Sequence, residues 1–538
     1  MKTFKFLKMT VVALILVGFV SCNDDIDDSG DNNGLGGNAS AETYLSISLS
    51  IPDGNSLKAD VEDSDNHEDG DTTENEVNKV NLYFFNSSNS YVTTVALSSL
   101  ELSTPGGAGS DFVTATKKKV PLDRGQTYKV FAIVNGEASV TPTSGTTVST
   151  FLGDAFSTGV FSISVPSTGL VMASRTTTGP GVSSPWVDLA IASNNGINNP
   201  DILKLQVERT VAKLELKGKV DGSKFNEYEV EYGASGGKDA TVKLTNYTVV
   251  NTTKDWFTFR HTAPDFAPST TAPTYQYSNI EISTGTGAIY AMDPNSYLKG
   301  DLPIGSYTDW NAWVSEYNNH VDANFNGSAT PVFNTAPTAS DPYSGSMPTT
   351  TAYAKLGYCY ENISSKDFQI NGYSTGIIFK AHVTPENNEV WGVDPGDNTQ
   401  LELVAINPST TDFYYYGKEF YKDIDALNLA YTEANIAVAD KDNVEKLKDE
   451  YGVDLLVKGV CYYKYWIRHL DNADPKMGVM EFAIVRNNLY KMEVKNINFI
   501  GSGTPTIDPE EENEVSAAYL NMQMSIRPWI VRTNNIDL

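Results

Sequence analysis

Apolar and polar residues alternate with a period of two along much of the chain, which is the pattern of half-buried β-strands. These runs are rich in β-branched and aromatic residues, and Gly, Pro, Asn, Ser and Thr separate them. They cover residues 80–85, 127–134, 161–165, 203–216, 227–232, 240–250, 376–383, 455–466 and 489–499. The pattern predicts an all-β protein of the sandwich type.

Helical character is confined to short stretches. Ala, Leu, Lys and Glu predominate over residues 427–451, and a shorter candidate lies at residues 310–317. We therefore expect helices only as minor insertions in the β-structure.

Two segments near opposite ends of the chain share one pattern. The first alternates serine with Leu45, Ile47, Leu49 and Ile51, and the second alternates polar residues with Leu520, Met522, Met524 and Ile526. Each presents four apolar side chains on one face and then reaches a proline. Both could therefore fill the same kind of groove in a β-sandwich.

Polar connectors join these two segments to the rest of the chain. Residues 60–76 are acidic, and residues 501–516 begin with glycine and proline and then carry an acidic run. Such chain is accessible to proteases and can reach out of a domain.

The first residues predict export. Lys2, Lys5 and Lys8 precede an apolar run over 11–20, which Ser21 and Cys22 follow. This run is shorter than the roughly 20 residues of a permanent membrane helix, so it indicates a signal peptide. A small residue directly before a cysteine is typical of lipoproteins, and Cys22 is the expected lipidation site, where a fatty acid such as palmitate is attached. The alternative is an ordinary secretory signal with an incidental cysteine.

The amino-acid composition limits which classes of partner are expected. With 39 Lys and Arg against 67 Asp and Glu, the net charge is -28, which disfavours nucleic acid and anionic headgroups as partners. We expect contact with a membrane only through the lipid of the precursor.

The 538 residues are too many for one core and predict two lobes. Besides Cys22, only Cys359 and Cys461 are present, so at most one disulfide is expected, and two buried thiols are equally compatible.

The sequence gives only weak signals for a catalytic or a metal-binding site. Gly372–Gly376 matches the pattern of a nucleophile elbow around Ser374, but a strand rather than a helix is predicted after it. The five histidines, His67, His261, His320, His382 and His469, lack metal-ligand spacing. Residues 65–70 with Glu76 approach a calcium loop, although a solvated acidic run explains them better. We therefore expect no catalytic residues, no metal and no cofactor.

The two matching segments have a structural and a functional interpretation. They could be the terminal strands of a monomer. Alternatively, a groove that loses its own strand could accept a strand from another subunit, which repairs the sheet edge and fills the apolar slot. Donor and acceptor surfaces then differ, so the contact does not close and generates a filament.

The sequence resembles the Bacteroidales fimbrilins, the subunits of type V pili, and most closely the minor fimbrilin family. The resemblance rests on the lipobox followed by residues 43–49, on 207–214, on 485–490 and on the tail 526–531, and it extends from the signal to the last residue. It implies two β-sandwich domains of the transthyretin-like Greek-key type with minor helical insertions. It also implies a structural protein rather than an enzyme.

The resemblance further implies a maturation route. The first strand, with Leu45, Ile47, Leu49 and Ile51, would be removed by a trypsin-like protease that cuts after a basic residue. The matching position here is Lys58, before Ala59, where relatives are expected to have arginine. The donor strand of another subunit, with Leu520, Met522, Met524, Ile526 and Trp529, would replace it.

The expected organisation follows from these points. Residues 1–21 form the signal peptide, 22–58 the propeptide, 59–207 and 208–516 the two sandwich domains, and 517–538 the donor strand. The expected function is that of a stalk subunit of a cell-surface fimbria, whose precursor is an outer-membrane lipoprotein. Expected partners are identical subunits, accessory tip and anchor fimbrilins, the maturation protease, and host or bacterial surface receptors.

Two other functions fit parts of the sequence. A tip or accessory adhesin of the same pilus would bind a ligand and would need no removable first strand. A cell-surface glycan-binding lipoprotein or hydrolase would keep its lipid and show an aromatic platform or a pair of carboxylates.

Overall fold

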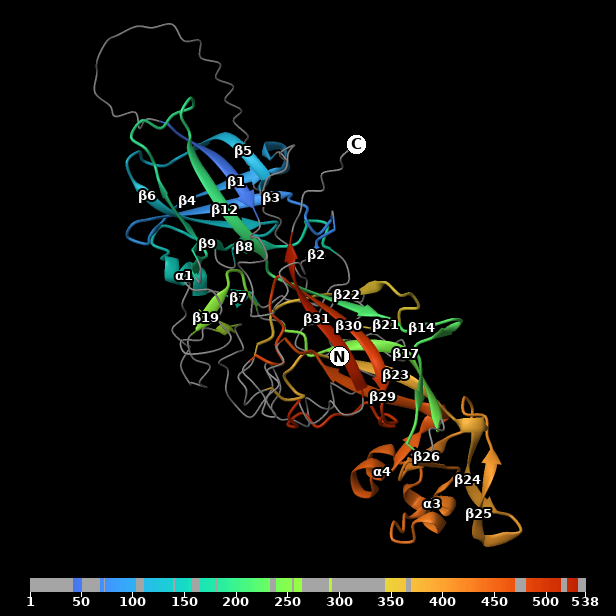
Figure 1. Ribbon diagram of the computed structural model, residues 1–538. Coiled ribbons are helices and arrows are strands. Elements are labelled where there is room, and N and C mark those ends of the chain that lie inside the picture. Colours follow the sequence, from blue (N-terminus) through green and yellow to red (C-terminus); the bar gives the residue numbers. More distant parts are fainter. Residues whose placement is uncertain are drawn as a thin grey trace, which may run out of the picture. The chain divides into compact units, whose positions relative to one another are not determined.

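β-Strands dominate the fold of the chain (Figure 1). The structure, a computed structural model, describes residues 42–50, 68–71, 73–102, 111–138, 141–153, 155–156, 165–179, 182–232, 239–253, 256–263, 290–292, 344–363, 369–469, 480–513 and 520–530. Its three α-helices in these ranges are short: α1 (Val148–Gly153), α3 (Ile424–Ala430) and α4 (Val444–Tyr451). The predicted all-β class is confirmed.

The N-terminal part of the chain forms one eight-stranded sheet in the order β4-β3-β6-β8-β12-β1-β5, with β11 paired to β6. Its strands are β1 (Thr43–Ser50), β3 (Lys79–Asn86), β4 (Tyr91–Ser98), β5 (Asp111–Val120), β6 (Thr127–Val134), β8 (Met172–Ser174), β11 (Val187–Ala190) and β12 (Asp201–Arg209). Side chains from both ends of this sheet, on β1 and β5 and on β3 and β4, line the same apolar core. The sheet therefore folds over itself as a sandwich.

A second core lies between two five-stranded sheets. One has the order β2-β31-β30-β13-β22, with β2 (Glu68–Asp69), β31 (Leu520–Ile530), β30 (Asn488–Ile497), β13 (Ala212–Lys217) and β22 (Tyr353–Cys359). The other contains β16 (Glu227–Val230), β17 (Ala240–Val250), β23 (Gly376–Pro385), β29 (Val460–Trp466) and β21 (Ser344–Ser346).

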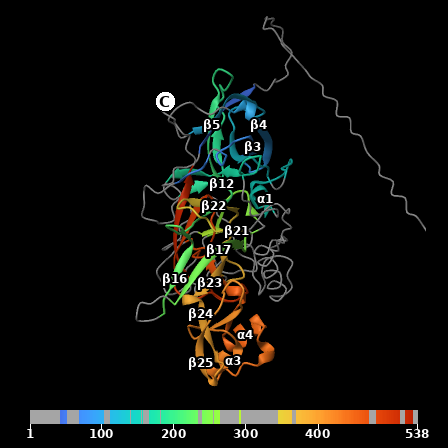
Figure 2. The ribbon, with the colours of Figure 1, turned by 90° about the vertical axis from the view of Figure 1, so that its right-hand side faces the viewer.

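A third five-stranded sheet lies between β23 and β29 in the sequence and carries two of the helices. Its order is β25-β24-β27-β26-β28, with β24 (Glu389–Asp394), β25 (Asp397–Ala405), β26 (Phe413–Tyr416), β27 (Glu419–Tyr421) and β28 (Asp454–Leu456). Helices α3 and α4 pack on it through a core of their own, and both views show them beside β24 and β25 (Figures 1 and 2). The sequence pattern did not predict this separate sheet.

The remaining strands are short pairs. They are β9 (Thr176–Gly179) with β10 (Val182–Ser184), β14 (Val220–Asp221) with β15 (Lys224–Phe225), β7 (Ala155–Phe156) with β18 (Trp256–Phe257), and β19 (His261–Ala263) with β20 (Tyr290–Met292). Four 3-10 turns, at residues 99–101, 386–388, 438–440 and 457–459, complete the regular structure. Within the ranges given above, no helix is long and apolar enough to cross a membrane.

Three predicted elements are divided in the structure. The strand expected over 203–216 is two strands in different sheets, because the chain changes sheet at Thr210, whose N–H and Oγ1 both donate to the carbonyl of Val171. The strand expected over 455–466 is interrupted by the 3-10 turn at 457–459.

The prediction of one long helix over 427–451 was also wrong. α3 ends at Ala430 and α4 begins only at Val444, so the region contains two separate α-helices. Asn443 interrupts the helical pattern, because its side chain caps the N-terminus of α4 by accepting from the N–H of Lys446. The expected helix at 310–317 and the expected strand at 161–165, apart from Val165, lie outside the described residues.

Candidate assembly site

β1 lies inside its sheet rather than at an edge. It pairs in parallel with β12 along one side and antiparallel with β5 along the other, so that Ile47, for example, lies between Leu203 and Ala115. A strand with partners on both sides leaves two unpaired edges when it is removed.

The apolar face of β1 is fully buried. The exposed fractions of Leu45, Ile47 and Leu49 are 0%, 2% and 1%. Burial of each side chain is worth roughly 1.5 to 3 kcal/mol. Removal of β1 would therefore leave an apolar slot as well as two open edges. Ser48 Oγ is buried without a hydrogen-bond partner among the described residues, and such a group costs about 1 to 3 kcal/mol, so β1 is an imperfect occupant.

Polar contacts fix the register at the start of β1. Asn195 accepts from the N–H of Tyr44 at 2.7 Å and donates through Nδ2 to the Tyr44 carbonyl at 2.8 Å. Thr43 Oγ1 donates to the carbonyl of Leu122 at 2.7 Å. Because these bonds join β1 to chain far away in the sequence, they hold the strand in one position.

The C-terminal segment pairs with its own chain. β31 runs antiparallel to β30, and its register places Met524 opposite Met492 and Ile526 opposite Tyr490. Both of these β30 residues belong to the second core, and Met522, opposite Val494, packs partly buried against that core. The predicted donor strand thus has an intramolecular position that the sequence did not indicate.

β31 pairs with β30 on one side, from Leu520 to Pro528. On the other side, β2 is its only strand partner among the described residues, where Glu68 pairs with Trp529 and Asp69 with Ile530. β31 is therefore almost an edge strand, in contrast to β1.

The chain that follows β2 is anchored by a buried acid. Glu74 is fully buried, with Lys213 Nζ at 2.9 Å and the Tyr358 hydroxyl donating to it at 2.5 Å. Arg209 Nη2 donates to the side chain of Asn75 at 2.5 Å. The chain is therefore held firmly at β1 and again at residues 74–75, on both sides of the expected cleavage site.

The segments 207–214 and 485–490 pair side by side through β13 and β30, and buried charges lie beside them. Glu208 pairs with Arg175 at 2.9 Å and with Arg260 at 3.1 Å. Burial alone would raise the pKa of Glu208, but the charges of Arg260, Arg175 and Arg486 overcome it and lower the pKa to about 2.

Arg486 completes this buried junction. It pairs with Glu361 at 2.7 Å and donates to the carbonyls of Thr258 and Phe257. The N–H of Asn487 donates to the carbonyl of Val211. Sequence reasoning missed this network, although charged residues inside an otherwise apolar run were a signal for it.

The other predicted site residues fall into two groups. Cys22, Ile51, Lys58 and Ala59 lie outside the described residues, as do the side chains of Leu520, Met524, Ile526 and Trp529. Among the rest, Ser374 is buried, and its Oγ donates to the Asn513 side chain at 2.5 Å. β23 follows it directly, as predicted, so the geometry of a nucleophile elbow is absent here.

The histidines and cysteines among the described residues form neither a metal site nor a disulfide. In the described part of the chain, no group of His, Cys, Asp and Glu could hold a metal ion. His67 and His320 are outside that part, and His261 and His469 are buried. Cys359 and Cys461 are both buried free thiols, which answers the question of their pairing. Burial raises the pKa of each thiol to about 12, so both are unreactive.

Two family models match the chain. Residues 43–205 match the model "Major fimbrial subunit protein (FimA)", and residues 455–535 match "Major fimbrial subunit protein type IV, Fimbrillin, C-terminal". The first match begins at β1 and the second includes β31, so both candidate assembly strands lie within matched segments. A search of curated proteins gave no match.

Solved structures with a similar course of the chain include a fimbrilin from Porphyromonas gingivalis, at 13% identity and a TM-score of 0.38, covering 92% of this chain and 99% of that one. A candidate cell adhesion protein from Parabacteroides distasonis has 11% identity and a TM-score of 0.40, with 91% and 100% covered. The tip fimbrial protein Mfa3 of P. gingivalis has 11% identity and a TM-score of 0.30, with 91% and 100% covered.

These TM-scores lie below 0.5, so the likeness rests on the two sequence models, which match opposite ends of the chain in the expected order. Over residues 43–205 and 455–535, this chain is similar to the structural subunits of fimbriae.

Proposed function

We propose that this chain is a stalk subunit that polymerises by donor-strand exchange after proteolysis. The precursor travels to the outer membrane as a lipoprotein acylated at Cys22, and a trypsin-like protease cuts between Lys58 and Ala59. Residues 22–58, with β1, then leave, and residues 517–538 of another subunit take their place. The remaining chain forms two domains, 59–207 and 208–516.

The inner position of β1 carries this proposal. A strand that lies between β5 and β12 and buries three large side chains leaves, on departure, a slot that a similar strand can fill. Such a slot offers main-chain hydrogen bonds on both sides and pockets for alternate side chains. It would be unstable while open, because its apolar floor and strand edges would meet water.

Strand pairing supplies the driving force for transfer of the tail. On its own chain β31 pairs fully with β30 but with only two residues of β2 on the other side. In the slot it would pair along its length with β5 and with β12. The additional ladder of hydrogen bonds favours insertion into another subunit over return to β30.

Cleavage of the purified precursor tests the proposal. Light digestion with a trypsin-like protease should give Ala59 as the new N-terminus and start polymerisation, measured by N-terminal sequencing and electron microscopy. Lys58→Ala should block both, whereas Lys204→Ala, at an exposed lysine on β12, should leave both unchanged. Normal fibres from Lys58→Ala would refute the scheme.

The position of β31 favours one second candidate function. A subunit whose tail stays on β30 could accept a strand but could not donate one, and it would terminate a fibre. The chain would then be an accessory or tip adhesin. Antibody labelling of intact fibres separates the two functions, because a stalk subunit is labelled along the whole length and a terminal subunit only at one end.

A further inference from the structure

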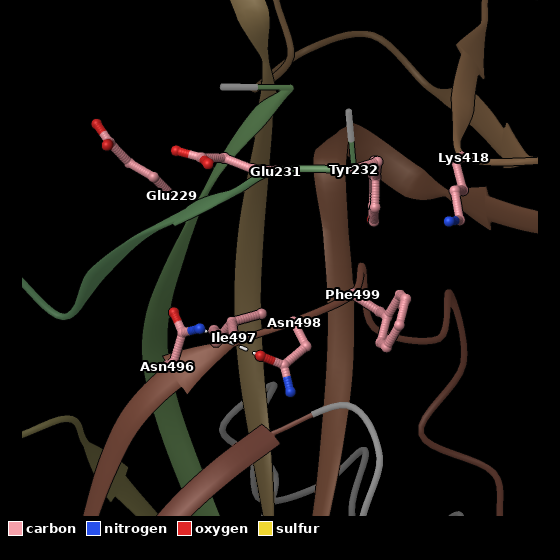
Figure 3. A pocket seen from close by; sticks show the side chains of 8 residues that line it. All are labelled: Glu229, Glu231, Tyr232, Lys418, Asn496, Ile497, Asn498 and Phe499. Atoms are coloured by element: carbon pink, nitrogen blue, oxygen red, sulfur yellow. Dashed lines mark hydrogen bonds between the residues drawn. The ribbon is translucent and has the colours of Figure 1, made fainter. Parts of the chain in front are cut away.

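A cavity of 570 Å³ opens where the end of β16, the end of β30 and the turn between β26 and β27 meet (Figure 3). Two aromatic side chains, Tyr232 and Phe499, lie on one side with Lys418, and Asn498 and Asn496 extend from Phe499 toward the other side. Two glutamates near the end of β16 lie on the other side. No residue of β1 lines this cavity, nor does Met522, the one β31 residue whose side chain the structure describes.

The aromatic side of the cavity is rigid. The Tyr232 ring stacks on Phe499 with centroids 6.2 Å apart and on Tyr415 at the same separation. Its hydroxyl accepts from the Ile500 N–H at 2.9 Å and from the Tyr415 hydroxyl at 2.7 Å. Phe499 is nevertheless 38% exposed. A large apolar ring is thus held in a fixed orientation while part of it faces solvent.

Polar groups surround this ring. Asn496 Nδ2 donates to Asn498 Oδ1 at 3.1 Å, which orients both exposed amides. Lys418 is at the tip of a tight hairpin, where φ is 59° at Gly417 and 71° at Lys418. Positive φ at both central residues is the geometry of a two-residue hairpin turn, and it fixes the backbone at Lys418. Its Nζ lies 5.7 Å from the centre of the Tyr232 ring.

We propose that this cavity binds a saccharide. The apolar C–H face of a pyranose would pack on Phe499, and its hydroxyls would bond to the amides of Asn496 and Asn498 and to Lys418. Sugar hydroxyls both donate and accept, so a lining with amides, an ammonium and carboxylates suits them. The lining carries two carboxylates and one ammonium, so it disfavours an acidic sugar, and the saccharide proposed is neutral.

A cationic peptide is the main competing ligand, since aromatic rings attract cations. Lys418 already lies over the Tyr232 ring and would repel a second cation there. The geometry therefore favours the neutral ligand. This inference goes beyond strand donation and does not depend on it, because the cavity is complete in the uncleaved chain.

Saturation-transfer NMR on the uncleaved protein tests the proposal. The probes are the methyl glycosides of galactose, N-acetylglucosamine, fucose and rhamnose, with an arginine-rich peptide as the competitor. We expect transfer to the ring C–H protons of at least one glycoside. Fucose or galactose would indicate a host glycan and rhamnose a bacterial one, and either result supports the proposal.

Matched variants locate the site. Phe499→Ala should weaken binding about tenfold, and Asn498→Ala should weaken it as well, whereas Phe499→Trp should retain it. Leu403→Ala, at an exposed apolar side chain on β25, is the control and should have no effect. Absence of transfer to every glycoside, equal transfer in Phe499→Ala, or binding of the peptide alone would overturn the proposal. None of these outcomes bears on polymerisation.

Discussion

At the scale of single residues, buried ion pairs lie beside the place where the segments 207–214 and 485–490 pair. Glu208 is 1% exposed and lies between two arginines. Removal of one charge from a buried ion pair leaves its partners as buried charges without an opposite charge nearby. This lowers the stability of the protein far more than the loss of a surface ion pair does.

Glu208→Gln should lower the free energy of unfolding by about 3 kcal/mol at pH 7. The pKa of Glu208 is about 2 in the folded chain, against 4.5 for an unperturbed glutamate. Its stabilisation is therefore fully present above pH 4.5 and is lost as the pH falls toward 2. Denaturant unfolding from pH 7 to pH 2 should show the two proteins converging in acid.

The control for this prediction is Glu137→Gln, since Glu137 pairs with Lys79 at the surface and is 72% exposed. It should cost less than about 1 kcal/mol. The buried His261 and His469, whose pKa burial lowers to about 3, also destabilise the protein in acid. They are present in both proteins, so the difference isolates Glu208. A constant difference down to pH 2 would contradict the prediction.

At the scale of elements, the proposed donation of a strand depends on whether β31 leaves β30. Its register places Met524 opposite the buried Met492, and Gln523 opposite Glu493 on the other face. The same alternation would apply in another subunit's slot, because the side-chain period of a strand is two.

Met524→Asp should cripple elongation, because a carboxylate on the apolar face loses its hydration when the strand inserts. Gln523→Lys should elongate nearly normally. Lysine is a better control than aspartate there, since aspartate would lie opposite Glu493. Light scattering of protease-treated subunits measures both, and elongation of Met524→Asp at the normal rate would exclude burial of this face.

A disulfide between β30 and β31 should stop elongation reversibly. Cysteines at the paired positions 492 and 524 would hold the tail on its own chain, and a reductant would release it. The single variants Met492→Cys and Met524→Cys serve as controls. If the oxidised double variant formed fibres, the tail would not need to leave β30, and strand donation by β31 would be wrong.

At the scale of the whole molecule, slot and tail belong to different sheets of one chain, which is the requirement for a contact that does not close on itself. In the proposed scheme, removal of the propeptide opens the acceptor slot, and release of the tail supplies the donor strand. The two events can be separated experimentally.

Cleaved subunits that lack residues 517–538 should not polymerise but should bind a synthetic peptide of that sequence. Uncleaved subunits should not bind it, because β1 fills the slot. Fluorescence anisotropy of the labelled peptide measures binding, and the peptide with Met524→Asp is the control. Equal binding to cleaved and uncleaved subunits would place the peptide elsewhere than the slot.

The sequence by itself determined the strands whose side chains alternate strictly. β6 and β17 were predicted to the residue, and β1 and β31 were both identified by four apolar side chains at period two. It also indicated that β23 follows Ser374, which removed the catalytic interpretation. For these strands the alternation of apolar and polar residues is enough to identify them, because one face of each strand is buried whichever strands pair with it.

Only the tertiary structure decided the rest, because it depends on which distant strands pair. Alternation cannot reveal that β1 is an inner strand, that β31 lies on β30, or that one apolar run divides at Thr210 between two sheets. The charges of Glu74 and Glu208 contradict local hydrophobicity and are explained only by partners far away in the chain. Side-chain period is a local property, whereas pairing and charge compensation are properties of the folded whole.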